Sequence, residues 1–157
     1  MTDIYCSRDT VRKVYEMKKI ITAIIFPLLI ICLCACGTND IKHNIFDIVE
    51  KNEDVLIEAI NTGEYEKIYA IGIKDITVND DYIVFYYTGR GIAPSSQEYG
   101  FYYSVENKPI AIFDGHPVCN PEEMTEKENG YEYIDNSYNS FYTEKVIEHF
   151  YYYDNNL

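Results

Sequence analysis

Residues 79–87 read NDDYIVFYY. Asn and Asp tolerate the backbone geometry of tight turns, whereas the β-branched and aromatic residues that follow favour extended structure. The apolar segment ahead of this turn, Ile71 to Val78, predicts a first strand. The whole stretch is therefore expected to form a β-hairpin, with Tyr82–Tyr87 as its second strand.

Three more segments downstream have the composition of strands. They are Gly100–Ser104, Ile110–Phe113 and Tyr131–Ile134, and short links join the first two of them. Consecutive strands with short connections favour an antiparallel meander. The polar residues 114–129 predict a surface loop. Residues 141–153 stay open between a helix and a strand, because their first half favours a helix and their aromatic second half favours a strand.

An amphipathic helix is predicted ahead of the strands. Apolar residues recur at steps of three and four between Ile41 and Ile60, and Asp40 can cap the first turn. Gly63 stands where a left-handed residue would end the helix after Thr62. The expected fold class is α+β: one N-terminal amphipathic helix packed on an antiparallel β-meander of four to five strands, within a single domain over residues 41–157.

The N-terminal region has the layout of an export signal. Residues 17–37 read MKKIITAIIFPLLIICLCACG, with two lysines ahead of an apolar run that ends in small residues. A helix that spans a membrane needs about 20 apolar residues, and this run is shorter. Residues 1–16 carry Asp3, Asp9 and Glu16, which suit the start of a signal poorly. We therefore interpret them as an upstream mis-start, with translation from Met17, or as an extended n-region.

Leu33-Cys34-Ala35-Cys36 resembles the lipobox of bacterial lipoproteins. The resemblance implies that residues 17–35 are a signal peptide, that Cys36 receives a diacylglycerol thioether, and that 36–40 form a short tether. It also implies a location at the extracytoplasmic face of the cell membrane. Cys34 departs from the pattern, in which Ala, Ser or Thr is usual at that position.

A second resemblance concerns the folded part. Gly100–Ser104, Tyr142–Lys145 and Tyr151–Tyr153 look like the matching segments of a group of small lipoproteins from Gram-positive bacteria. That group brings no known activity, so it implies no catalytic residue for this chain.

Charge limits the classes of partner. The chain carries a net charge of −13, and residues 1–35 contain five basic and three acidic side chains, so the remaining 122 residues carry −15. This charge argues against a nucleic-acid partner and against an anionic lipid surface. It is compatible with a cationic partner or with a solvated exterior. After processing only Cys36 and Cys119 would remain, so no internal disulfide is expected.

Few residues suggest catalysis. Asp114, His116 and Cys119 form the pattern D-x-H-x-x-C, which matches no strong zinc signature. We predict no catalytic residue, no metal and no cofactor. A small hydrolase that uses residues 114–119 stays an alternative.

The tyrosines offer a binding surface. The chain has 17 Tyr and no Trp, and alternate residues of a strand face opposite sides. We therefore expect Tyr87 and Tyr103 to face water while Tyr86 and Tyr102 face the core, or the reverse. Arg90, the only Arg after residue 35, lies close by in the sequence and joins this candidate surface. The alternative is that tyrosine simply fills strand positions well.

These observations predict a lipid-anchored extracytoplasmic protein that is not an enzyme. It would act as a binding or accessory module at the cell envelope, with an unknown protein or glycan as its partner. An inhibitor or immunity-type protein that masks a cationic partner is a further alternative.

Overall fold

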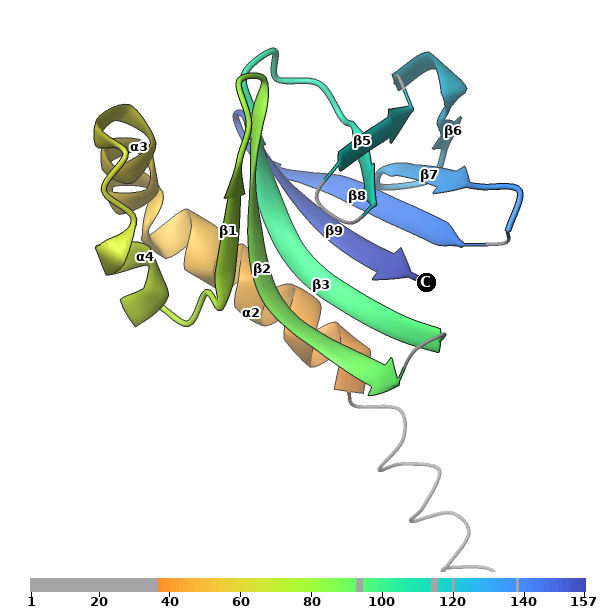
Figure 1. Ribbon diagram of the computed structural model, residues 1–157, viewed down its shortest axis with the longest axis horizontal. Coiled ribbons are helices and arrows are strands. Elements are labelled where there is room, and N and C mark those ends of the chain that lie inside the picture. Colours follow the sequence, from red (N-terminus) through yellow and green to blue (C-terminus); the bar gives the residue numbers. More distant parts are fainter. Residues whose placement is uncertain (1–36, 93–94, 114–115, 120, 138) are drawn as a thin grey trace, which may run out of the picture. The chain divides into compact units, whose positions relative to one another are not determined.

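The computed structural model describes residues 37–92, 95–113, 116–119, 121–137 and 139–157. Residues 41–157 form one unit of the α+β class, with helices against one face of an antiparallel sheet (Figure 1). The predictions for Cys36, for the signal segment 17–35 and for residues 1–16 lie outside the described residues.

Three helices precede the strands: α2 (Gly37–Lys51), α3 (Glu53–Thr62) and α4 (Glu66–Ala70). The single helix expected up to Thr62 is wrong, because the helix breaks at Asn52, whose φ is −123°. The Asn52 side chain donates to the Ile48 carbonyl at 2.7 Å, a local bond that competes with the helical pattern. The end at Gly63 is confirmed: its φ is 74° and its N–H donates to the Ala59 carbonyl.

The main sheet has seven strands in the order β1-β2-β3-β9-β8-β7-β6, and β4 pairs with β5 in a separate two-stranded sheet. All the pairs are antiparallel. The strands are β1 (Asp75–Val78), β2 (Tyr82–Ile92), β3 (Ser95–Ser104), β4 (Ala111–Phe113), β5 (His116–Cys119), β6 (Thr125–Glu126), β7 (Tyr131–Ile134), β8 (Ser140–Ile147) and β9 (Phe150–Asn156).

The predicted meander is right for its first three strands only. The β1–β2 hairpin is confirmed, with Ile76 opposite Phe85, and β3 follows it in the sheet. The fourth predicted strand, β4, does not continue the meander. The C-terminal strand β9 takes the place beside β3 instead, and residues 140–156 are a strand pair rather than a helix. The expected four to five strands are thus too few, since nine are present among the described residues.

The surface loop expected over residues 114–129 is also wrong where the structure describes that segment. It contains β5, a short 3-10 helix (Pro121–Glu123) and β6. Met124 is only 9% exposed and packs into the core. The polar composition of this segment suggested a loop. The buried Met124 side chain and the pairing of β4 with β5 hold it in place instead.

Aromatic side chains fill both faces of the sheet. On β9, Phe150 and Tyr152 pack toward the helices, whereas Tyr151 and Tyr153 pack on the opposite face. The helical side is filled by Ile45, Val49, Leu56, Ile68, Phe85 and Phe101. The other side is filled by Val84, Tyr102, Ala111, Ile112, Met124 and Phe141. A central strand buried on both faces cannot offer an open flat surface.

Helix α2 is fastened to the sheet near its amino-terminal end by Lys42. The Lys42 ammonium pairs with the Glu144 carboxylate on β8, and it lies 5.4 to 5.7 Å from the ring centres of Phe46, Tyr142 and Tyr152. The Tyr142 hydroxyl donates to the same carboxylate at 2.7 Å. The Lys42 ammonium is attracted by the carboxylate and by the rings. Because these partners surround it, they also fix where this part of α2 lies on the sheet.

Candidate binding site between α3 and α4

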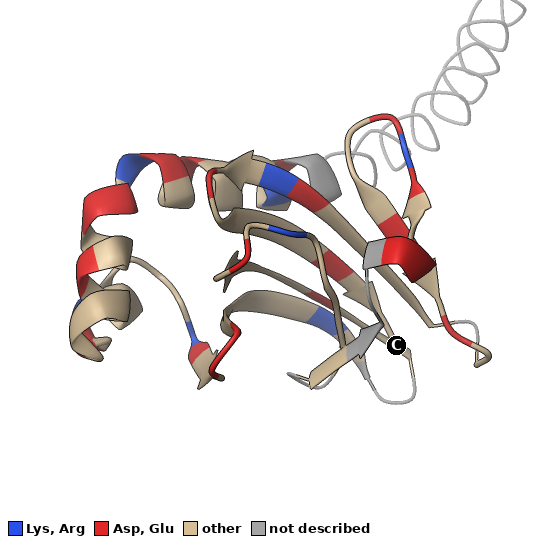
Figure 2. Ribbon diagram, turned by 90° about the horizontal axis from the view of Figure 1, so that it is seen from above, with Lys and Arg blue, Asp and Glu red and all other residues tan. Residues whose placement is uncertain are grey.

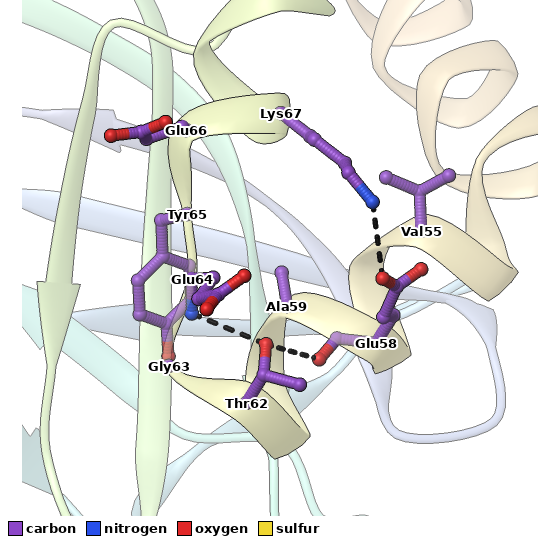
Figure 3. Close-up of a pocket in the computed structure, with 9 residues that line it drawn as sticks. All are labelled: Val55, Glu58, Ala59, Thr62, Gly63, Glu64, Tyr65, Glu66 and Lys67. Carbon is purple, nitrogen blue, oxygen red and sulfur yellow. Dashed lines mark hydrogen bonds and ion pairs between the residues drawn. The ribbon is translucent and has the colours of Figure 1, made fainter.

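A pocket lies where α3 turns into α4 (Figure 3). Its volume is about 430 Å³, within the range of small-ligand sites. The left-handed residue Gly63 reverses the chain there, and the Thr62 hydroxyl accepts from the Glu64 N–H at 3.3 Å while it donates to the Glu58 carbonyl. The lining residues are Val55, Glu58, Ala59, Thr62, Gly63, Glu64, Tyr65, Glu66 and Lys67. We call this the α3–α4 pocket.

The lining of the pocket is acidic. Glu58, Glu64 and Glu66 are among its residues, and Lys67 is the one basic residue there. The Glu66 carboxylate points away from Glu58 and Lys67 (Figure 3). Lys67 reaches across from α4 to Glu58, with 3.0 Å between Nζ and Oε1 (Figure 3). Both side chains of this pair are more than half exposed, so the pair contributes at most about 1 kcal/mol. The lining residues therefore carry a net charge of −2, from three glutamates and one lysine.

Apolar groups form the rest of the pocket wall. Ala59 is 3% exposed, and Val55 is half-buried beside it. Tyr65 is half-buried and meets the edge of Phe85 at a centroid distance of 6.5 Å, which joins the pocket to the helical-side core. Burial raises the pKa of the Tyr65 phenol. A neutral aromatic ring beside carboxylates suits an organic cation, because the cation is attracted by the face of the ring and by the negative charges.

The whole domain shares this charge. Acidic segments recur along the helices and on the loops, with few basic segments between them (Figure 2). The pocket therefore lies within a broadly negative surface, which attracts cations over a distance and repels anions.

The residues predicted as a binding surface do not form an open face. Tyr103 is half-buried, with its ring stacked on His149 at 5.3 Å and edge-on to Phe150 at 5.2 Å. Tyr87 is half-buried as well, against the helical-side core. Arg90 is exposed on β2. The expected flat ladder of exposed tyrosines is absent from this part of β2 and β3, because Tyr87 and Tyr103 pack against the helical-side core.

The segment considered for hydrolysis is only partly described. His116 is exposed on β5, and Asp114 lies outside the described residues. Across the described ranges, no three His, Cys, Asp or Glu residues gather as metal ligands. None of the helices in those ranges is both long and apolar enough to cross a bilayer.

Asp154 on β9 carries a perturbed carboxyl group that the sequence did not suggest. It faces the helical side between its cross-strand neighbours Tyr99 and Tyr142, and its Oδ1 atom is buried without a hydrogen-bond partner. Burial raises the pKa of Asp154 from its ordinary value of 3.8 to about 6. The burial of Asp154 could not be predicted from the sequence, because a polar residue near the end of a strand usually faces solvent.

The raised pKa predicts how stability depends on pH. The folded protein holds the Asp154 proton more tightly than the unfolded chain, so stability falls as the pH rises from about 4 to about 6. Asp154→Asn removes the charged form and should stabilise the fold at pH 8 by about 1–2 kcal/mol, after a discount for partial exposure. At pH 4 it should change little. Urea unfolding at both pH values measures this, with Asp80→Asn as the exposed control. An equal effect at both pH values would refute the prediction.

Comparison of the chain with protein-family models, with curated proteins and with solved structures gives no match.

Proposed function

We propose that the protein is a bacterial lipoprotein, held at the extracytoplasmic face of the cell membrane by a lipid on Cys36. We further propose that it works there as a non-enzymatic binding module whose α3–α4 pocket receives a cationic group of a protein partner. Support for the anchor comes from the segment Leu33–Cys36 and from the lysines and apolar run that precede it.

The observation that carries the binding role is the composition of the α3–α4 pocket. Three glutamates and one lysine line this pocket together with Val55, Ala59 and Tyr65. Such a lining accepts hydrogen bonds from a lysine or arginine side chain and also contacts its aliphatic stem. The net charge of −15 after residue 35 steers a basic partner toward the domain.

An inhibitor or immunity-type role is the second candidate, and the same acidic pocket favours it. In that case the cationic partner would be a protein whose activity is blocked when the domain covers it. A glycan partner and a hydrolase that uses residues 114–119 stay predictions from the sequence, and the pocket adds nothing to either.

Neutralising the pocket should weaken the binding of a basic peptide. We expect the triple variant Glu58→Gln, Glu64→Gln, Glu66→Gln to bind a synthetic peptide rich in lysine and arginine about 10–100-fold less tightly. This corresponds to about 0.5–1 kcal/mol for each carboxylate lost. Isothermal titration calorimetry at low ionic strength measures the change, and salt should weaken the wild-type binding.

The matched control changes the same net charge elsewhere. Glu122, Glu123 and Glu126 are exposed and lie outside the pocket, so their triple change to Gln should leave most of the affinity intact. If both triple variants lose the same affinity, the peptide senses only the overall charge and the pocket is not the site.

A further inference from the structure

We propose that the protein binds a small, soluble quaternary ammonium compound in an aromatic cage on the helical side of the sheet, and that its own Lys42 side chain occupies this cage until the compound replaces it. The cage consists of Phe46 on α2, Tyr142 and Glu144 on β8, and Tyr152 on β9. We call it the Lys42 cage. It is a second site for a cation, since it shares no residue with the lining of the α3–α4 pocket.

Three aromatic rings surround the Lys42 ammonium. Its Nζ atom lies 5.4 Å from the ring centre of Phe46 and 5.7 Å from the ring centres of Tyr142 and Tyr152. The Tyr152 ring is inclined by 51° to the Phe46 ring and by 61° to the Tyr142 ring, so the rings form walls of different orientation rather than a stack. Burial raises the pKa of both tyrosines, and their rings therefore stay neutral. Walls of this kind recognise quaternary ammonium groups.

Glu144 gives the cage its negative charge. Its carboxylate pairs with Lys42 and also accepts a hydrogen bond from the Tyr142 hydroxyl at 2.7 Å. The Glu144 side chain is only 15% exposed, so solvent screens its charge weakly. Because Tyr142 stays bonded to it, the carboxylate keeps its position when one cation replaces another. The cage therefore attracts an organic cation by charge as well as by its ring faces.

The distances in the cage fit a methylated ammonium better than the ammonium of a lysine. Nζ lies close to the limit of about 6 Å for an attraction between a cation and a ring. A bond from nitrogen to carbon is about 1.5 Å long, so methyl groups on a nitrogen at this point would lie about 4 Å from the ring centres. Carbon atoms attract each other best at about 3.5–4.0 Å. A trimethylammonium group thus fills space that Lys42 leaves open.

Lys42 can be displaced from the cage. Its side chain is 32% exposed, so solvent reaches it. As a tethered group it competes with a free ligand at an effective concentration of about the millimolar range, which keeps dilute cations out. Its departure would break the ion pair from α2 to Glu144 on β8. Ligand binding is therefore coupled to the attachment of α2 on the sheet.

Removing the resident cation should open the cage. We expect Lys42→Ala to bind choline about tenfold more tightly than the wild type does, because apparent affinity falls with the fraction of time that a site is closed. Isothermal titration calorimetry at constant ionic strength measures both affinities. Lys42→Arg keeps a cation on α2 and should behave like the wild type. If Lys42→Ala does not fold, Lys42→Gln replaces it with the same expectation, since its amide can still donate to Glu144. The neutral isostere of choline, in which carbon replaces nitrogen, should bind at least about tenfold more weakly to the opened cage.

Two further variants locate the bound choline. In the Lys42→Ala background, Phe46→Leu removes one ring and keeps an apolar side chain, and it should weaken choline binding about fivefold. In the same background, the changes Glu58→Gln, Glu64→Gln and Glu66→Gln should leave the affinity unchanged. Equal choline affinity in the wild type and Lys42→Ala, no binding to Lys42→Ala, or loss of binding in the glutamine variant would each overturn the Lys42 cage as the site.

A competition experiment separates a soluble ligand from a lipid headgroup that carries the same trimethylammonium group. Tyr152 is only 3% exposed, so the cage is recessed and a headgroup held in a bilayer cannot enter it. Vesicles of phosphatidylcholine should therefore leave choline binding to Lys42→Ala unchanged. Competition by the vesicles would overturn the assignment of a soluble ligand.

Discussion

Replacing Tyr102 by alanine should cost about 3–5 kcal/mol of unfolding free energy, a large part of the about 5–15 kcal/mol typical of a domain. The Tyr102 side chain is fully buried on the face opposite the helices, and its ring stacks on Tyr151 at 5.3 Å. Its hydroxyl lies 2.9 Å from the Thr143 hydroxyl and accepts from the Ile110 N–H at 3.0 Å. The change removes the ring and takes the acceptor from the Ile110 N–H, whereas the Thr143 hydroxyl keeps its bond to the Tyr152 carbonyl.

The neighbouring Tyr103 provides the matched comparison. It faces the helical side and is only half-buried, so Tyr103→Ala should cost less, about 1–2 kcal/mol. Tyr102→Phe keeps the ring and should lose about 1–2 kcal/mol through the hydroxyl, which gives a measurable value if the alanine variant fails to fold. Urea unfolding of the three variants decides the matter. An equal and small cost for both alanine variants would contradict a sheet that is covered on both faces.

Cys36→Ala should abolish retention of the protein at the membrane. A single acyl chain binds a bilayer only marginally, whereas two chains bind it stably, so one diacylglycerol group on Cys36 is sufficient for anchoring. The variant should appear in the soluble extracytoplasmic fraction or accumulate as an unprocessed precursor. Fractionation followed by immunoblotting measures the distribution.

Cys119→Ser is the control for this experiment, because Cys119 is the only other cysteine after residue 35. This variant should remain in the membrane fraction like the wild type. Membrane retention of Cys36→Ala would show that something other than a lipid on this residue holds the protein there.

The parts of the fold that follow from local sequence were predictable. The apolar stripe of residues 41–60 led to helices that pack on the sheet, and Gly63 ended them in the left-handed conformation that a missing Cβ allows. The hairpin of β1 and β2 followed from a polar turn between apolar segments. The break at Asn52 was missed, because it depends on one side-chain hydrogen bond within an otherwise regular pattern.

Long-range pairing was not predictable in the same way. Strand β3 pairs with β9, which is about fifty residues further along the chain, rather than with β4. Local propensity gives no partner for a strand, and it left residues 141–153 undecided. The burial of Tyr102 and Tyr151 on one face follows from this pairing, and so does the loss of the expected open tyrosine surface.

The candidate pocket was also missed from the sequence, although a signal for it was present. Glu58, Glu64 and Glu66 lie on both sides of Gly63, and a chain reversal at this glycine brings α3 and α4 together. Helix α4 has only five residues, which is too short for periodicity to reveal it. Unless α4 is predicted, these glutamates look like solvated side chains at the end of a helix.

The most direct measurement is mass spectrometry of the protein extracted from the membrane of the cells that produce it. The proposed function predicts that the mature chain begins at Cys36 and that this residue carries a thioether-linked diacylglycerol. A chain that still contains residues 17–35, with Cys36 unmodified, would contradict the lipoprotein assignment.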